Sequence, residues 1–228
     1  MASKASNWET QLWSYLSAGN GMHCPQFSSC SARLSGGYCP DTDKDRFNQL
    51  INSDDHFLPD DFHQVKPCGG EIMQHVERLA EHKFGRNRAD ELPVPTNLIE
   101  LASEEHPIEV RPLDLRACYA ATWYMPDGWV IQVSDAISPS RKRFTLFHEA
   151  FHIIAHNCCQ TPKFKQRGGN QGSFNELLAD YFAICVLMPQ ERVREQWLEL
   201  SDVDGMAIAF DVPTSTMWLR LKEMDLIN

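Results

Sequence analysis

The stretch Arg143-Phe-Thr-Leu-Phe-His-Glu-Ala-Phe-His-Ile-Ile-Ala-His156 contains the pattern His148-Glu149-x-x-His152. Residues four apart lie on one face of an α-helix, so both imidazoles can reach a single ion. Glu149 can then act on a water held by that ion without being a ligand. We predict a helix over 144–156 with two zinc ligands, His148 and His152, and a general base, Glu149. Chance produces this pattern in roughly two of a hundred such chains, so its surroundings decide.

A second apolar helix predicted over 173–189 carries Glu176 and Asp180, four residues apart and therefore on one face. Acids on the buried face of such a helix are costly unless they meet a cation or a donor. A catalytic zinc takes three protein ligands, and a ligand histidine usually donates its other N–H to a carboxylate. We therefore predict Glu176 as the third ligand and Asp180 as the acceptor. The alternative is that Glu176 is a surface acid favoured by the helix dipole.

A different extended motif, HExxHxxGxxH, does not fit, because Ala155 and Cys158 occupy its glycine and third histidine positions. The segment from Arg143 to His152, followed by Glu-Leu-Leu-Ala-Asp-Tyr-Phe-Ala from Glu176 and by Leu-Met-Pro189, resembles the ImmA/IrrE family of zinc metallopeptidases. The family pattern is R-F-T-x-x-H-E-x-x-H, then E-x-x-A-[ND]-x-F-A and L-M-P. The match is strong over about 129–190 and extends back to about residue 95.

The resemblance implies a zincin-like metallopeptidase whose zinc ligands are His148, His152 and Glu176 and whose base is Glu149. It further implies intracellular cleavage of a specific protein, often a helix-turn-helix transcriptional repressor. Peptide hydrolysis also needs a donor to the developing oxyanion. His156, one turn beyond His152, and Tyr181, beside Asp180, are the candidates, although each side chain could equally be packed or solvated. The strand 129–133 is a candidate edge for a substrate strand.

The chain has 228 residues, 43% of them hydrophobic, and a formal charge of −10. This composition supports a packed core and argues against general nucleic-acid binding, which needs a basic face. The N-terminus lacks the apolar region of a secretory signal, and no apolar run is long enough to span a bilayer. We therefore expect a cytoplasmic protein without a membrane partner.

Residues 1–70 are predicted to form a Cys-rich N-terminal extension that the family resemblance does not reach. Cys24, Cys30, Cys39 and Cys68 could hold a structural zinc or an iron–sulfur cluster. Their spacing matches no C-x-x-C knuckle, so the alternative is reduced cysteines packed as small hydrophobes.

Residues 71–190 are predicted to be the metallopeptidase domain. A helix over 71–84 should end at Gly85, and Thr96 should cap a short helix. From residue 107 the pattern alternates, which predicts strands over 108–110, 118–124 and 129–133, the last two joined as a hairpin. The fold class expected is therefore α+β, mainly helical with a small antiparallel sheet.

Residues 191–228 are predicted to form a C-terminal helical segment. A helix over 190–200 precedes two helices joined by a turn at 211–213, a spacing similar to a helix-turn-helix, with Thr214 or Ser215 as cap. Only Arg220 and Lys222 are basic in the second of these helices, which is unfavourable for phosphate contacts. Packing against the domain is the favoured role.

Three functions are consistent with the sequence. The first is a zinc endopeptidase acting on a protein partner, as favoured above. The second is a non-enzymatic transcriptional regulator with structural zinc. The third is a metal- or redox-sensing module that controls an attached peptidase. The sequence assigns no oligomeric state.

Overall fold

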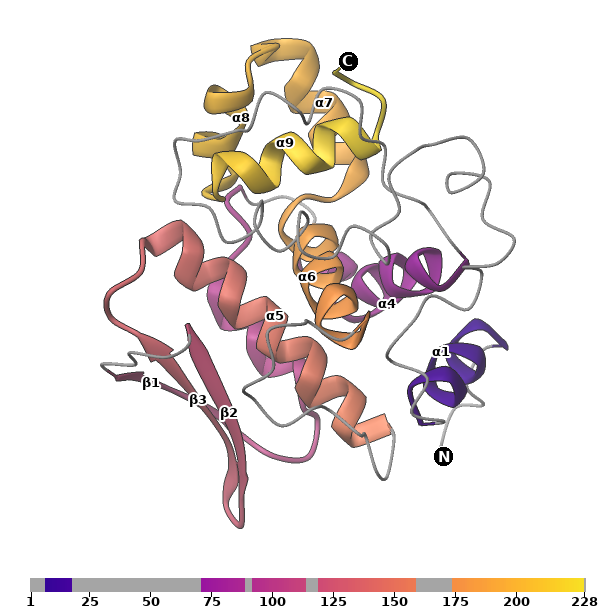
Figure 1. Ribbon diagram of the computed structural model, residues 1–228, viewed down its shortest axis with the longest axis vertical. Coiled ribbons are helices and arrows are strands. Elements are labelled where there is room, and N and C mark those ends of the chain that lie inside the picture. Colours follow the sequence, from indigo (N-terminus) through magenta and orange to yellow (C-terminus); the bar gives the residue numbers. More distant parts are fainter. Residues whose placement is uncertain (1–6, 18–70, 89–91, 114–118, 159–173, 228) are drawn as a thin grey trace.

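Figure 1 shows the protein as a computed structural model that describes residues 7–17, 71–88, 92–113, 119–158 and 174–227. The helices are α1 (Asn7–Ser17), α4 (Glu71–Arg88), the 3-10 helix η2 (Thr96–Ala102), α5 (Pro139–Cys158), α6 (Phe174–Leu187), α7 (Gln190–Leu200), α8 (Val203–Phe210) and α9 (Thr214–Glu223). The strands are β1 (Ile108–Leu113), β2 (Ala120–Met125) and β3 (Gly128–Ser134). The described part is mainly helical with one small sheet, as predicted.

The sheet has the order β1-β3-β2. β2 and β3 form the predicted antiparallel hairpin, with Met125 opposite Gly128 at its turn. β1, in contrast, runs parallel to β3, with Ile108 opposite Trp129. The prediction of an antiparallel sheet is therefore wrong for one of the two pairings. Alternation of apolar and polar residues identifies a strand, but it does not say which edge the strand joins or in which direction.

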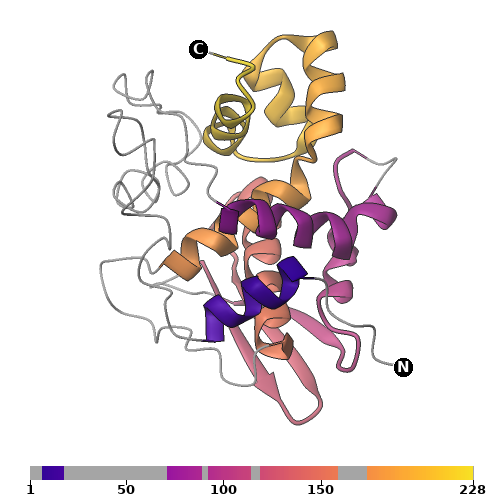
Figure 2. The ribbon, with the colours of Figure 1, turned by 90° about the vertical axis from the view of Figure 1, so that its right-hand side faces the viewer.

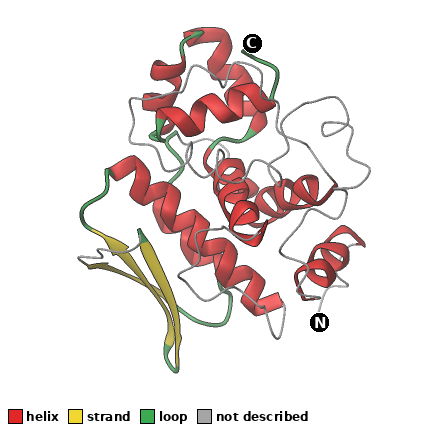
Figure 3. Cartoon of the chain, viewed as in Figure 1, coloured by secondary structure: helices red, strands yellow, loops and turns green. Residues whose placement is uncertain are grey.

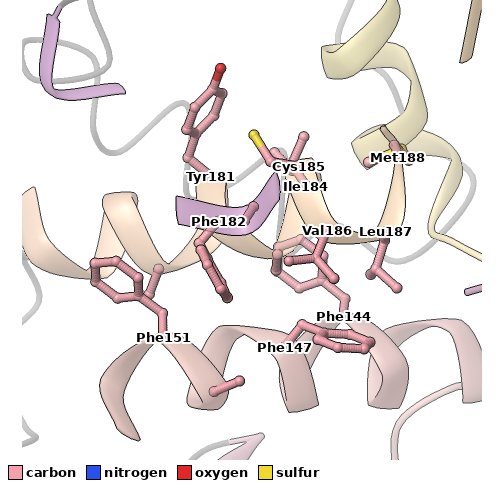
Figure 4. Close-up of a cluster of buried hydrophobic side chains, with 14 of the residues drawn as sticks. Phe144, Phe147, Phe151, Tyr181, Phe182, Ile184, Cys185, Val186, Leu187 and Met188 are labelled. Carbon is pink, nitrogen blue, oxygen red and sulfur yellow. The ribbon is translucent and has the colours of Figure 1, made fainter. Parts of the chain in front are cut away.

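Helix α5 lies across one face of the sheet, and α4 and α6 pack on the opposite side of α5 (Figures 1 and 2). Phe84 of α4 inserts where α5 and α6 meet, with its ring centroid 5.7 Å from that of Phe147 and 5.9 Å from that of Phe182. Figure 4 shows Phe147 and Phe151 of α5 facing Phe182 of α6. This aromatic contact fixes the two helices that carry the predicted metal ligands.

Three predicted helix boundaries are wrong. α5 begins at Pro139 and not at residue 144. α4 continues through Gly85 to Arg88. Glycine costs only about 1 kcal/mol relative to alanine in a helix, and burial of the neighbouring Phe84 offsets that cost. Thr96 begins η2 but makes no capping bond with its side chain, and the cap position belongs to Pro95, whose carbonyl accepts from the Leu98 N–H.

The C-terminal helices α7, α8 and α9 gather at one end of the molecule (Figure 3). α8 and α9 are joined through residues 211–213, as predicted, but the cap position of α9 is Pro213 and no side chain caps it. Arg220 and Lys222 are both buried, and α9 presents its residues 215–222 to the interior. The helix that would read DNA in a helix-turn-helix is therefore turned inward, in keeping with a packing role.

One hydrophobic core runs from α4 through α5 and α6 into the C-terminal helices, where it includes Met206, Phe210 and Met217. Among the described residues, no helix has the length and apolar character needed to cross a membrane. The four cysteines of the predicted second metal site, Cys24, Cys30, Cys39 and Cys68, lie outside the described residues, as does most of the predicted extension.

Candidate metal centre

Helix α5 presents a different chemistry on each of its faces. Phe147 and Phe151 face the helical core, as described above. His148 and His152, one position further along, share a neighbouring face, and their Nε2 atoms lie 3.1 Å apart. Glu149 points instead toward the sheet, where it meets β2. The i, i+4 spacing therefore brings both imidazoles to one point, as predicted from the sequence.

Helix α6 brings a carboxylate to the same point. Glu176 lies in its first turn, and its two oxygens are 3.4 Å from Nε2 of His148 and 3.6 Å from Nε2 of His152. His148, His152 and Glu176 thus form a cluster able to hold a metal ion, the only such group of three among the residues that the structure describes. Glu176 therefore lies where the predicted third ligand is needed, and it is also an acid in the first turn of a helix, as the alternative states.

The cluster has the dimensions that a tetrahedral zinc ion requires. Zinc bonds to imidazole nitrogen and carboxylate oxygen are roughly 2.0–2.1 Å long, which places tetrahedral ligand atoms about 3.3 Å from one another. The two Nε2 atoms of His148 and His152 are 3.1 Å apart, and each has a Glu176 oxygen nearby, Oε2 at 3.4 Å from His148 and Oε1 at 3.6 Å from His152. With one ligand atom taken from each residue, the three atoms lie within 4.8 Å of one another. Two imidazoles and one carboxylate are also a donor set typical of catalytic zinc, which keeps a fourth position for water or substrate.

Asp180 orients the first of the two histidines. Its Oδ1 lies 2.7 Å from Nδ1 of His148, the nitrogen on the opposite side of the ring from the cluster. This bond fixes the ring and the tautomer, leaving Nε2 to face the ion. Burial disfavours a charge on His148, but Asp180 and Glu176 outweigh it and raise its pKa well above the usual range. Burial likewise opposes ionisation of Glu176, yet His152 and His148 hold its pKa below the ordinary value.

Glu149 is held by a residue that the sequence pattern does not indicate. Its side chain is buried, and its Oε2 accepts a hydrogen bond of 2.6 Å from the hydroxyl of Thr122 on β2. Thr122 lies 27 positions before Glu149, and no fixed spacing relates a strand residue to a helix residue at that distance. Only two features of the sequence could have indicated this contact: the alternating pattern of β2 and the apolar neighbours of Glu149 on α5.

The two candidate oxyanion donors are placed differently. His156 lies one turn beyond His152, and its ring packs against Tyr124 and Trp129, with centroids 5.4 and 4.9 Å away. Tyr181 points away from α5 (Figure 4), and its hydroxyl donates to Glu223 of α9. The structure therefore does not bring Tyr181 to the cluster, because adjacent residues of a helix such as Asp180 and Tyr181 project in different directions.

Comparisons with known proteins identify a family and a similar fold. The family model described as Peptidase_M78, IrrE N-terminal-like domain, matches residues 103–222, a range that begins before β1 and ends in α9. No curated protein matches the sequence. Among solved structures, the fold is similar to that of a Mycobacterium tuberculosis transcriptional regulator, with a TM-score of 0.51 and 20% identity. That alignment covers 65% of this chain and 46% of the other, so it spans less than half of the regulator.

Proposed function

The chain belongs to the family of IrrE N-terminal-like domains, Peptidase_M78, and on this premise we propose that it is a zinc-dependent endopeptidase. The supporting observation is the cluster of His148, His152 and Glu176, which can each offer one ligand atom within 4.8 Å of the others. These three residues would hold the ion, and Glu149 lies on α5 beside the two histidines. A purely structural zinc would need a fourth protein ligand, and the described residues supply three.

When bound, zinc supplies Lewis acidity, which makes water a better nucleophile and polarises a peptide carbonyl. Glu149 takes the proton from the attacking water and returns it to the leaving amine, so that this carboxylate acts first as base and then as acid. Asp180 keeps His148 in the orientation that ligation needs. His156 is the remaining candidate for the donor to the oxyanion, since Tyr181 donates to Glu223.

The edge for an extended substrate is β2 rather than the predicted strand 129–133. β3 is central in the sheet and its two edges pair with β1 and β2. Within the described residues, β2 pairs only with β3. A peptide added along the edge of β2 opposite β3 would pass next to Glu149, because Thr122 of that strand contacts it.

We propose further that the substrate is a helix-turn-helix transcriptional repressor. The support is the resemblance to the ImmA/IrrE family, whose members often cut such repressors. In this proposal, cleavage relieves repression of stress-response or mobile-element genes.

Co-expression with the repressor encoded beside this gene tests the proposal. The wild-type protein should cut the repressor, and mass spectrometry of the fragments would identify the peptide bond that is cleaved. Glu149→Gln should bind zinc with unchanged stoichiometry and cleave at least about a hundredfold more slowly, since general-base catalysis contributes about 10²–10⁴. His148→Ala should lose both zinc and activity.

Unchanged cleavage by a zinc-loaded Glu149→Gln protein would show that Glu149 is not the base. If the repressor stays intact, new N-termini that form in cells with the wild-type protein, but not with Glu149→Gln, would identify another target. Their complete absence would overturn the endopeptidase proposal.

A further inference from the structure

We infer that Thr122 is the positioning residue for Glu149: its hydroxyl holds one carboxylate oxygen and leaves the other directed to the reacting water. This inference rests on the proposed function. It starts from the hydrogen bond of 2.6 Å between Thr122 Oγ1 and Glu149 Oε2. A hydroxyl donating to a carboxylate at this distance makes a strong, charge-assisted bond.

The burial of Glu149 gives this bond its importance. Only 8% of the residue is exposed, and a buried carboxylate needs a donor to offset the loss of water. Among the hydrogen bonds recorded for the described residues, Glu149 has Thr122 as its side-chain partner. The hydrogen bond from Thr122 therefore offsets part of the desolvation of the Glu149 carboxylate and also fixes the orientation of that carboxylate.

The backbone of Thr122 faces the edge of β2 that lies opposite β3. The N–H of Ser134 donates to the carbonyl of Tyr119 over 2.8 Å, which makes these two residues a hydrogen-bonded pair. Hydrogen-bonded and non-hydrogen-bonded pairs alternate along an antiparallel ladder. Thr122, three positions on and opposite Ile131, is therefore in a non-hydrogen-bonded pair. Its N–H and C=O point away from β3, toward the edge where a substrate strand would add.

Thr122 thus has two connections, one through its side chain to the base and one through its backbone to the proposed path of the substrate. A peptide that pairs at Thr122 is brought into a fixed relation to Glu149. Mispositioning a catalytic group by about 1 Å can cost up to about a hundredfold in rate. Loss of the hydroxyl should therefore slow the chemical step while ligand geometry at the metal is preserved.

The test compares Thr122→Val, which keeps the shape of the side chain, with Thr122→Ser, which keeps the hydroxyl. The substrate probe is a fluorogenic peptide that copies the cleavage site mapped by co-expression. Thr122→Val should lower kcat about ten- to a hundredfold, with KM and bound zinc unchanged. Thr122→Ser should stay within about threefold of the wild type. Gln132→Leu is the matched control, since it breaks the Trp123–Gln132 bond on the outer face of the same sheet.

A second measurement, on the zinc-free protein, needs no activity. Thr122→Val should lower Tm by about 3–8 °C, because it leaves a buried carboxylate without its donor. In a Glu149→Leu background, the same substitution should change Tm by less than about 1 °C. Additive Tm changes would show that the two side chains do not interact in solution and would overturn the inference.

The kinetic outcomes are equally decisive. Full activity of Thr122→Val, or equal loss in Thr122→Ser and Thr122→Val, would overturn the role of the hydroxyl. Loss of zinc in Thr122→Val would show a structural role instead. A wild-type protein that cleaves no target overturns the proposed function itself, and the positioning role with it, whereas the Tm comparison still reports on the bond.

Discussion

Asp180 touches no metal ligand atom of the cluster, yet it determines how His148 presents its ring. Its carboxylate lies 2.7 Å from Nδ1 of His148 and is itself largely buried. Replacing it with asparagine keeps an acceptor oxygen but removes the charge that strengthens the bond. The partners of metal ligands generally contribute a factor of about 10–100 to metal affinity.

Asp180→Asn should therefore weaken zinc binding about 10–100-fold without unfolding the protein. Competition with a zinc chelator of known affinity measures the change, and circular dichroism verifies the fold. Asp204→Asn, an exposed acid in the first turn of α8, is the matched control. Equal zinc affinities for Asp180→Asn and Asp204→Asn would show that Asp180 does not contribute to zinc binding.

The residues of the candidate site that the sequence predicts are those related by helical spacing. His148, Glu149 and His152 lie within one helix, and Glu176 and Asp180 within another, so periodicity alone groups them. Thr122 could not be predicted in this way, because the contact joins two kinds of element with no fixed register between them. Tyr181 was misplaced for a related reason: proximity in sequence to Asp180 does not give a shared direction on a helix.

The helices and strands themselves were largely predictable, and their ends and partners were not. Apolar periodicity locates α4, α5 and α6, but α4 passes through Gly85 and η2 begins without a side-chain cap because tertiary packing outweighs local preference. The direction of β1 depends on which edge of β3 it joins. The local pattern of apolar and polar residues does not indicate which edge a strand joins.

The pairing of α5 with α6 depends on a few aromatic side chains. Phe182 of α6 is fully buried and contacts Phe84 of α4 and Phe151 of α5. Phe182→Ala should reduce the free energy of unfolding by about 3–5 kcal/mol, because it leaves a cavity among three helices. Urea denaturation measures the loss.

Leu198→Ala provides the control for this substitution, since Leu198 of α7 is 84% exposed and should change stability by less than about 0.5 kcal/mol. The zinc-loaded Phe182→Ala protein should recover part of its stability, because zinc binds the folded state. A loss below about 1 kcal/mol for Phe182→Ala would mean that the core repacks around the missing ring.

Across the whole molecule, two arginines connect the helices α4 and α5 and the end of α6 to the C-terminal segment. Arg143, near the start of α5, forms an ion pair of 3.0 Å with Asp211 in the turn before α9. Arg220 of α9 is almost completely buried, donates to the carbonyl of Met188 beyond α6, and pairs with Glu77 of α4 and with Glu223. The pKa of Arg220 is raised well above its ordinary value, because these acids outweigh the effect of burial.

Arg220→Met should lower the free energy of unfolding by about 3–5 kcal/mol, since it leaves Glu77 and Glu223 without their cation in a buried site. Urea denaturation again measures the loss. Arg194→Met, on the exposed face of α7, should change the value by less than about 0.5 kcal/mol. If Arg220→Met and the wild type have equal free energies of unfolding, the buried ion pairs add nothing beyond what a hydrophobic side chain provides.

The same ion pairs bear on the order of events in folding. Arg220 and Glu77 are 143 positions apart in the chain, whereas Arg220 and Met188, like His148 and Asp180, are 32 apart. Contacts between nearby segments close smaller loops and form earlier. We expect the contact between α9 and α4 to form late, so that Arg220→Met accelerates unfolding more than it slows folding in stopped-flow experiments. The lifetime of the folded protein between openings is then governed by a helix that contributes no ligand to the metal.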